Sequence, residues 1–145
     1  MMTDRRAPLQ HLPAMTFEQM LEKVRYEGAY PTRERAEEAV RLVLSGLGRQ
    51  LTGEERDELA ARLPLEAARI LTQQVPDSQA LTAWAFVKDL ADRAGAPLAP
   101  TRWDTGSVLT TVAALAGPEL LTRILRHLPS GYALLFGRAE LAPAA

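Results

Sequence analysis

Residues 32–47 read TRERAEEAVRLVLSGL and carry the clearest structural signal in the chain. From Ala36 to Leu47 the apolar residues fall at offsets 0, 3, 4, 7, 8 and 11, which is the spacing of one face of an α-helix. The opposite face carries the charged residues Arg33, Glu34, Glu37, Glu38 and Arg41. The stretch therefore predicts an amphipathic helix that packs against others, and the glycines Gly46 and Gly48 predict a weak C-terminal end.

The composition of the whole chain favours helices as well. Of the 145 residues, 24 are Ala and 23 are Leu, whereas only two are Ile and seven are Val. Ala and Leu are strong helix formers, and strands prefer β-branched and aromatic residues. The composition argues against an all-β fold, and the length fits one domain with its own core.

Two helix starts around this stretch are marked by capping signals. Thr16 with Gln19 forms a predicted capping box, and Met15 and Met20 occupy the positions of a hydrophobic staple. Thr52 with Glu55 predicts a second capping box, and Leu63-Pro64 ends that helix.

The pattern then recurs in the second half. Helices are predicted from about Thr82, from about Arg102 after the loop APLAP, from Pro118 to Leu128, and over a short segment from Tyr132. Matched residues are separated by similar distances: Met20 from Phe86 by 66 positions, Val40 from Val108 by 68, and Leu63 from Leu128 by 65. We therefore expect an all-α fold of about eight helices, in two tandem four-helix repeats packed as one compact domain.

The expected boundaries follow from this pattern. Repeat one spans 15–76 and repeat two spans 77–137. Residues 1–14, with two prolines and no clear period, form a flexible N-terminal arm, and residues 138–145 form a flexible tail.

These elements resemble a known bacterial and archaeal family, the domain-of-unknown-function family 2267 (DUF2267). The motifs that carry the resemblance are Phe17/Met20/Leu21, the helix 36–47, the stretch LTGEE at 51–55, ARLP at 61–64, and Leu128-Pro129 followed by Leu135-Phe136. The resemblance spans residues 15–137. It implies an all-helical two-repeat protein without an established activity, and it transfers no catalytic residue. The second copy has Ala116-Gly117-Pro118 in place of the acidic loop.

The charge balance and the absence of cysteine exclude several classes of protein. Seventeen basic and eighteen acidic residues give a net charge of −1, and neither half has a basic excess, so nucleic acid is not the expected partner. Zero cysteine removes disulfides, thiol catalysis and thiolate-bound zinc. Without a signal peptide or an apolar run of membrane-spanning length, the expected location is the cytoplasm, with no membrane partner.

Catalytic and metal-binding patterns are not found. His11 and His127 are the only histidines, and they lack the spacing of a metal site. The acidic cluster Glu54, Glu55, Asp57 and Glu58 is interpreted as a solvated helix start that complements the helix dipole, with cation binding or an acid–base pair as the alternatives. We therefore predict no enzyme activity, no cofactor and no metal.

Two tryptophans form the main candidate interaction surface. Trp103 follows Arg102 at the predicted helix start, and Trp84 lies about 200° around the helix from the core residue Phe86. The two indoles either complete the seam between the repeats or, if exposed, mark with Arg102 a surface for a partner or for self-association.

A possible basic patch consists of Arg62, Arg69, Arg123 and Arg126. The alternative is that these side chains are solvated and locally paired, as Glu58 with Arg62 and Glu119 with Arg123.

The leading functional hypothesis is a non-enzymatic helical module for protein–protein interaction or self-association. The alternatives are a nucleic-acid- or ribosome-associated binder that uses an arginine face, and a small-ligand sensor with a pocket between the repeats.

Overall fold

The computed structural model describes residues 15–138, and this part of the chain is all-α, as expected. Its helices are α2 (Phe17–Gly28), α3 (Arg33–Gln50), α4 (Gly53–Arg62), α5 (Leu65–Thr72), α6 (Ala83–Ala94), α7 (Leu98–Ala116), α8 (Pro118–His127) and α9 (Tyr132–Leu135). The predicted arm, which includes His11, and residues 139–145 of the predicted tail lie outside the described residues.

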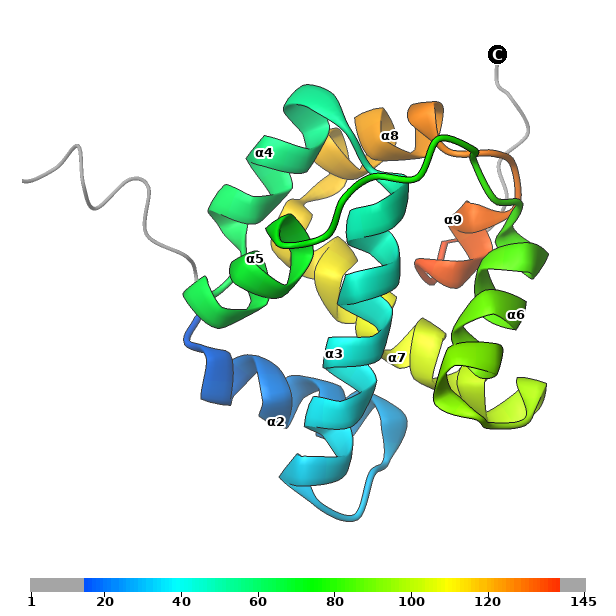
Figure 1. Cartoon of the computed structure of the whole chain (residues 1–145). Helices are drawn as coiled ribbons and strands as arrows, with labels where there is room; N and C mark the ends of the chain where they lie inside the picture. The colour runs from blue at the N-terminus through cyan, green and yellow to red at the C-terminus, as the bar shows by residue number, and fades with distance from the viewer. Residues whose placement is uncertain (1–14, 139–145) are drawn as a thin grey trace, which may run out of the picture.

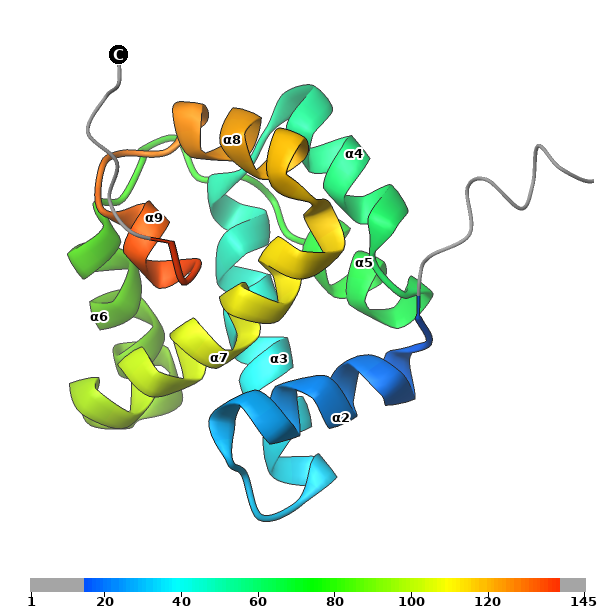
Figure 2. The same cartoon turned by 180° about the vertical axis from the view of Figure 1, so that it is seen from behind.

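The two longest helices, α3 and α7, cross at the centre of the molecule (Figures 1 and 2). Helix α2 packs on both of them at one end, and α6 packs on both at the side (Figure 1). Helix α5 covers α3, α9 covers α7, and α4 and α8 lie against each other. The predicted apolar stripe of α3 is fully buried in this arrangement, including Ala36, Val40, Val43, Leu44 and Leu47.

The helix pairings are those that a two-fold relation between the halves would produce. Helix α2 contacts α7 while α6 contacts α3, and the central pairs α3–α7 and α4–α8 join corresponding helices of the two halves. The order of long and short helices is also similar in the two halves. The duplication itself and the repeat boundaries stay predictions.

The glycines near the end of α3, where the sequence predicts a weak C-terminal end, do not interrupt the helix. The helix continues to Gln50, and both glycines lie at close helix contacts. A Cβ on Gly46 would lie 2.8 Å from a methyl group of Leu90 on α6, and a Cβ on Gly48 would collide with the carbonyl oxygen of Leu71 on α5. These positions allow α5 and α6 to approach α3.

Helix α7 starts at Leu98, four residues before the predicted start at Arg102. The prolines of the presumed loop fit the helix start, because the first-turn N–H groups have no partner within the helix. Along α7 the buried hydroxyls of Thr101, Thr105 and Thr111 each donate to the carbonyl oxygen four residues earlier. Because these buried hydroxyls are hydrogen-bonded, α7 can carry polar residues and still be surrounded by other helices.

The two predicted capping boxes have different outcomes. The box at Thr16 is confirmed: its hydroxyl accepts from the Gln19 N–H, and the Gln19 side chain accepts from the Thr16 N–H. The prediction of a capping box at Thr52 is wrong, because the Thr52 side chain makes no capping hydrogen bond. The Glu55 carboxylate instead faces α8, where it lies 3.4 Å from His127 Nε2.

Within residues 15–138, no helix combines the length and the apolar character needed to cross a membrane.

Candidate functional site

An apolar groove lies between α6, the N-terminal turns of α7, and α9, which neighbour one another in Figure 2. We call it the α6–α9 groove, and its volume is about 490 Å³. It is lined by Ala83, Trp84, Val87, Leu98, Ala99, Arg102, Gly131, Leu134 and Leu135. Arg102 is the only charged side chain in this lining, so the groove can hold an apolar ligand surface and one complementary charge.

Large apolar side chains around the groove are unusually exposed. Trp84 is 65% exposed, Leu134 53% and Leu98 40%. They come from three different helices, and elsewhere most large apolar side chains are buried in the core. Exposed apolar side chains that gather around a hollow are typical of an interaction surface, whereas scattered ones need no explanation.

A smaller hollow continues the groove on the far side of Arg102. It is lined by Arg102 and Trp103 together with Glu27 of α2, and Leu134 and Leu135 line both hollows. Within the described residues, no carboxylate oxygen lies within 4.0 Å of the exposed Arg102 guanidinium. The structure therefore brings all three predicted surface residues, Trp84, Arg102 and Trp103, to one continuous surface.

Trp103 is both a seam residue and an exposed residue. Its indole Nε1 donates to the carbonyl oxygen of Gly28 at 2.9 Å, which joins α7 to the end of α2. The side chain is nevertheless 56% exposed. Trp103 therefore joins the two halves of the chain and is exposed at the same time, while its role in binding stays a prediction. The predicted helix start at Arg102 was wrong, because α7 begins one turn earlier.

The wall formed by α9 is held by one buried side chain, Tyr132. Its hydroxyl donates to the carbonyl oxygen of Leu81 at 2.9 Å, and its ring meets Phe86 edge-to-face with centroids 5.5 Å apart. Burial raises the pKa of the Tyr132 hydroxyl far above its usual range. These contacts fix α9 to α6, so the groove is formed before any partner binds.

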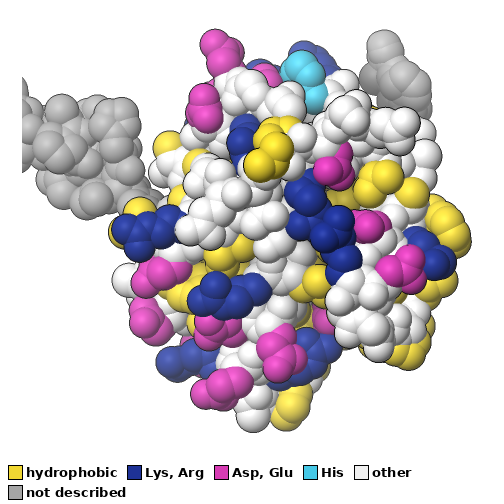
Figure 3. Space-filling view, viewed as in Figure 1, with side chains coloured by type: hydrophobic (Ala, Val, Ile, Leu, Met, Phe, Trp, Pro, Cys, Tyr) yellow, Lys and Arg dark blue, Asp and Glu magenta, His cyan; other side chains and the backbone are white. Residues whose placement is uncertain are grey.

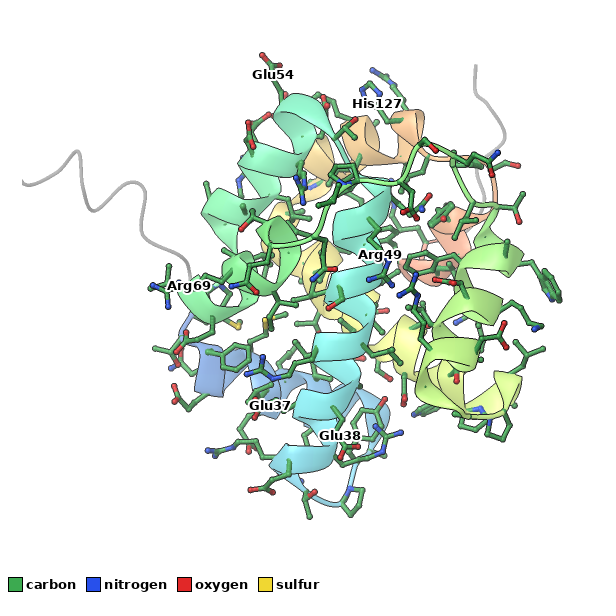
Figure 4. All side chains as sticks on the ribbon, viewed as in Figure 1. Glu37, Glu38, Arg49, Glu54, Arg69 and His127 are labelled. Carbon is green, nitrogen blue, oxygen red and sulfur yellow. The ribbon has the colours of Figure 1, made fainter. Side chains whose placement is uncertain are left out.

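A third hollow, of about 370 Å³, lies apart from these two, where α3 meets the α6–α7 junction. Its charged lining residues are Arg35, Glu38 and Asp104, and its apolar lining includes Leu42 and Pro100. Figure 4 shows Glu38 on the lower part of α3. This hollow lies between the two predicted repeats, where the small-ligand alternative places a pocket.

The polar residues beneath this hollow form a network that the sequence did not reveal. Buried Tyr30 donates to Asp104 Oδ1 at 2.6 Å, and Arg35 donates to both carboxylate oxygens, at 3.2 and 2.9 Å. The Arg35 guanidinium also lies 5.1 Å from the centroid of the Tyr30 ring. Burial, together with the hydrogen bond to Asp104, raises the pKa of Tyr30 well above its usual range.

The four arginines of the possible basic patch do not face one ligand. Arg62 donates to the carbonyl oxygen of Ala116, and Arg123 donates to both carboxylate oxygens of Glu58, one of them at 3.0 Å. Arg69 lies on α5, far from the end of α8 that His127 marks in Figure 4. Arg126 is on α8. In Figure 3, basic and acidic side chains alternate over much of the visible face.

The ion pairs expected within single helices are replaced by pairs between helices. Glu58 was expected to pair with Arg62 and Glu119 with Arg123, but Glu58 on α4 binds Arg123 on α8. The hydrogen bonds from Arg123 lower the pKa of Glu58 and raise that of Arg123. Because α4 and α8 pack together, Glu58 and Arg123 reach each other although they are 65 positions apart in the sequence.

The molecule is thus an all-α protein in which several of the exposed large apolar side chains gather at one preformed groove. Residues 17–135 match the family model described as "Uncharacterized conserved protein (DUF2267)", and the chain belongs to this family, as its motifs indicated. A search of curated proteins found no match.

Proposed function

We propose that this protein is a non-enzymatic interaction module that binds a protein partner through the α6–α9 groove. The supporting observation is the exposure of Trp84, Leu98 and Leu134 around one groove that also contains Arg102. Tryptophan and arginine are the residue types that most often dominate binding energy at protein interfaces.

The construction of the groove favours binding as well. Tyr132 and Phe86 hold α9 in place, and the indole of Trp103 is held by Gly28. A rigid surface loses little conformational entropy when a partner binds, which leaves more of the apolar contact energy as affinity.

The chemistry of the lining supports a binding role over a catalytic one. The residues of the α6–α9 groove supply no carboxylate, hydroxyl or imidazole side chain. General acid–base or nucleophilic catalysis requires such groups close to the substrate. A cytoplasmic location and the absence of enzyme activity remain parts of this proposal.

An affinity experiment with matched variants tests the proposal. The wild-type protein and the variants Leu134→Arg and Val75→Arg are used to capture partners from the native host. Val75 is 81% exposed and lies outside the groove, so Val75→Arg is the control for an added surface charge. We expect a partner that is retained by wild type and by Val75→Arg and is lost by Leu134→Arg. Equal retention by all three proteins contradicts the proposal.

A small-ligand role is the second candidate, and the hollow of about 370 Å³ beside Arg35 and Asp104 favours it. A ligand that binds there stabilises the folded state by mass action. Thermal-shift screening of a metabolite library tests this role. A hit is expected to lose its effect in Leu42→Trp, which fills the hollow, and to keep it in Leu134→Arg.

A further inference from the structure

We infer that the occupant of the α6–α9 groove is an amphipathic helix of a partner protein that places a carboxylate opposite Arg102. The inference rests on the proposed function, and it adds the secondary structure and the charge of the partner segment. It follows from the backbone of this protein, the distribution of apolar side chains and the single charge of the groove.

A helix suits this groove because it makes its own backbone hydrogen bonds. The walls of the groove are helices, and outside the N–H groups of their first turns their backbone N–H and C=O groups are largely used within each helix. A peptide that binds as an added strand gains most of its affinity from backbone pairing with a sheet edge, and no sheet edge is found among the described residues. A helix satisfies its own backbone groups and needs only side-chain contacts from the groove.

The apolar side chains of the groove suit one face of an amphipathic helix. The exposed side chains of Trp84, Leu98 and Leu134 share the lining with small side chains such as Ala83 and Ala99 and with buried Val87. A helix presents apolar residues at positions i, i+3, i+4 and i+7 along one face, and such a ridge fits between walls of large side chains.

The charge of Arg102 selects the charge of the partner segment. Arg102 lines both hollows, is exposed, and has no carboxylate within 4.0 Å among residues 15–138. An acidic residue beside the apolar ridge would form a charge-assisted pair with it. A second copy of this protein fits the groove less well than an acidic helix does. A symmetric pairing of two grooves brings two copies of Arg102 into one interface, where like charges repel.

Selection from a library of random peptides tests the inference. Displayed peptides of about 16 residues, some four helical turns, are selected on the full-length wild type, on Arg102→Glu and on Arg102→Lys. We expect wild-type binders to carry apolar residues at helical spacing with Asp or Glu beside them. Arg102→Glu should select Lys or Arg at that position, and Arg102→Lys should keep the acidic preference.

The same peptides separate the two claims. Selected binders should lose at least tenfold affinity on Trp84→Ala and keep it on Tyr26→Ala, a change at an exposed aromatic residue outside the groove. If no binder depends on Trp84, the groove is not a protein-binding site, and both the proposed function and this inference fail. If binders depend on Trp84 but have alternating apolar residues, or the same charges on wild type and Arg102→Glu, only this inference fails.

Discussion

The hydroxyl of Tyr30 donates to Asp104 Oδ1 at 2.6 Å, although the two residues are 74 positions apart. Tyr30 lies between α2 and α3, and Asp104 is on α7. Arg35 completes the network from α3. Three elements are therefore joined at the point where the first half of the chain meets the second.

Removal of this carboxylate should destabilise the fold. In Asp104→Ala the buried Tyr30 hydroxyl loses its acceptor, and an unsatisfied buried polar group costs about 1–3 kcal/mol. Urea unfolding measures the loss. Asp92→Ala is the control, because Asp92 is 63% exposed and pairs only with Lys88 on the same helix. Its effect should stay below about 1 kcal/mol, and equal losses in both variants would show that the network is not a special contact.

Alkaline pH should destabilise the protein through Tyr30 and Tyr132. Both hydroxyls have a raised pKa in the folded state, so they stay protonated at a pH where the unfolded chain releases the protons. Their stabilising contribution is complete below the ordinary tyrosine pKa of about 10 and is lost as pH rises beyond it.

Unfolding measured as a function of pH checks this effect. Tyr132→Phe should reduce the alkaline slope of the free energy of unfolding by up to about 1.4 kcal/mol per pH unit. Tyr26→Phe, at an exposed tyrosine, is the matched control. An unchanged slope in Tyr132→Phe would contradict the link between its burial and the pH dependence.

Two glycines in helices should respond to alanine in opposite ways. Gly48→Ala forces a methyl group against the Leu71 carbonyl oxygen, and such overpacking costs about 1–3 kcal/mol. At Gly106 the new Cβ would lie 2.9 Å from the flexible end of Arg102, which can move aside. Gly106→Ala should therefore leave stability unchanged or raise it by up to about 1 kcal/mol. Thermal unfolding of both variants decides the matter, and a tolerated Gly48→Ala would contradict the tight packing of α5 on α3.

The pair between α4 and α8 should control the titration of Glu58. Arg123 holds the pKa of Glu58 below its usual range, so Arg123→Ala should shift this titration toward higher pH. Carboxyl NMR signals followed through acid pH measure the shift. Arg126→Ala is the control, because Arg126 is also on α8 but does not donate to Glu58. This variant should leave the titration of Glu58 unchanged. Equal shifts in the two variants would show that only net charge matters.

Features that depend on near neighbours in sequence were predictable. The Thr16 cap and the apolar stripe of α3 involve residues within a few turns, and both are present. The cap expected at Thr52 is absent, and the Glu55 side chain faces Arg123 and His127, which are more than sixty positions away. The start of α7 was misplaced because proline signals a loop as readily as a first helical turn.

The candidate site was predictable only in part. Its two tryptophans and Arg102 stood out by residue type, since tryptophan and arginine anchor many interfaces. Leu98 and Leu134 did not, because an exposed leucine has the same sequence spacing as a buried one. The network of Tyr30, Arg35 and Asp104 also left no local pattern, as its members come from both halves of the chain.

Site-specific photocrosslinking in the native host tests most directly whether the α6–α9 groove binds a protein. A photoreactive phenylalanine analogue is placed at position 134 in the groove or at the exposed position 26 on α2. If the groove binds a protein, we expect a discrete protein adduct from position 134. This adduct should be lost when Trp84→Ala is added, and position 26 should give no such adduct. Absence of an adduct at position 134, or the same adducts from both positions, would contradict protein binding at the groove.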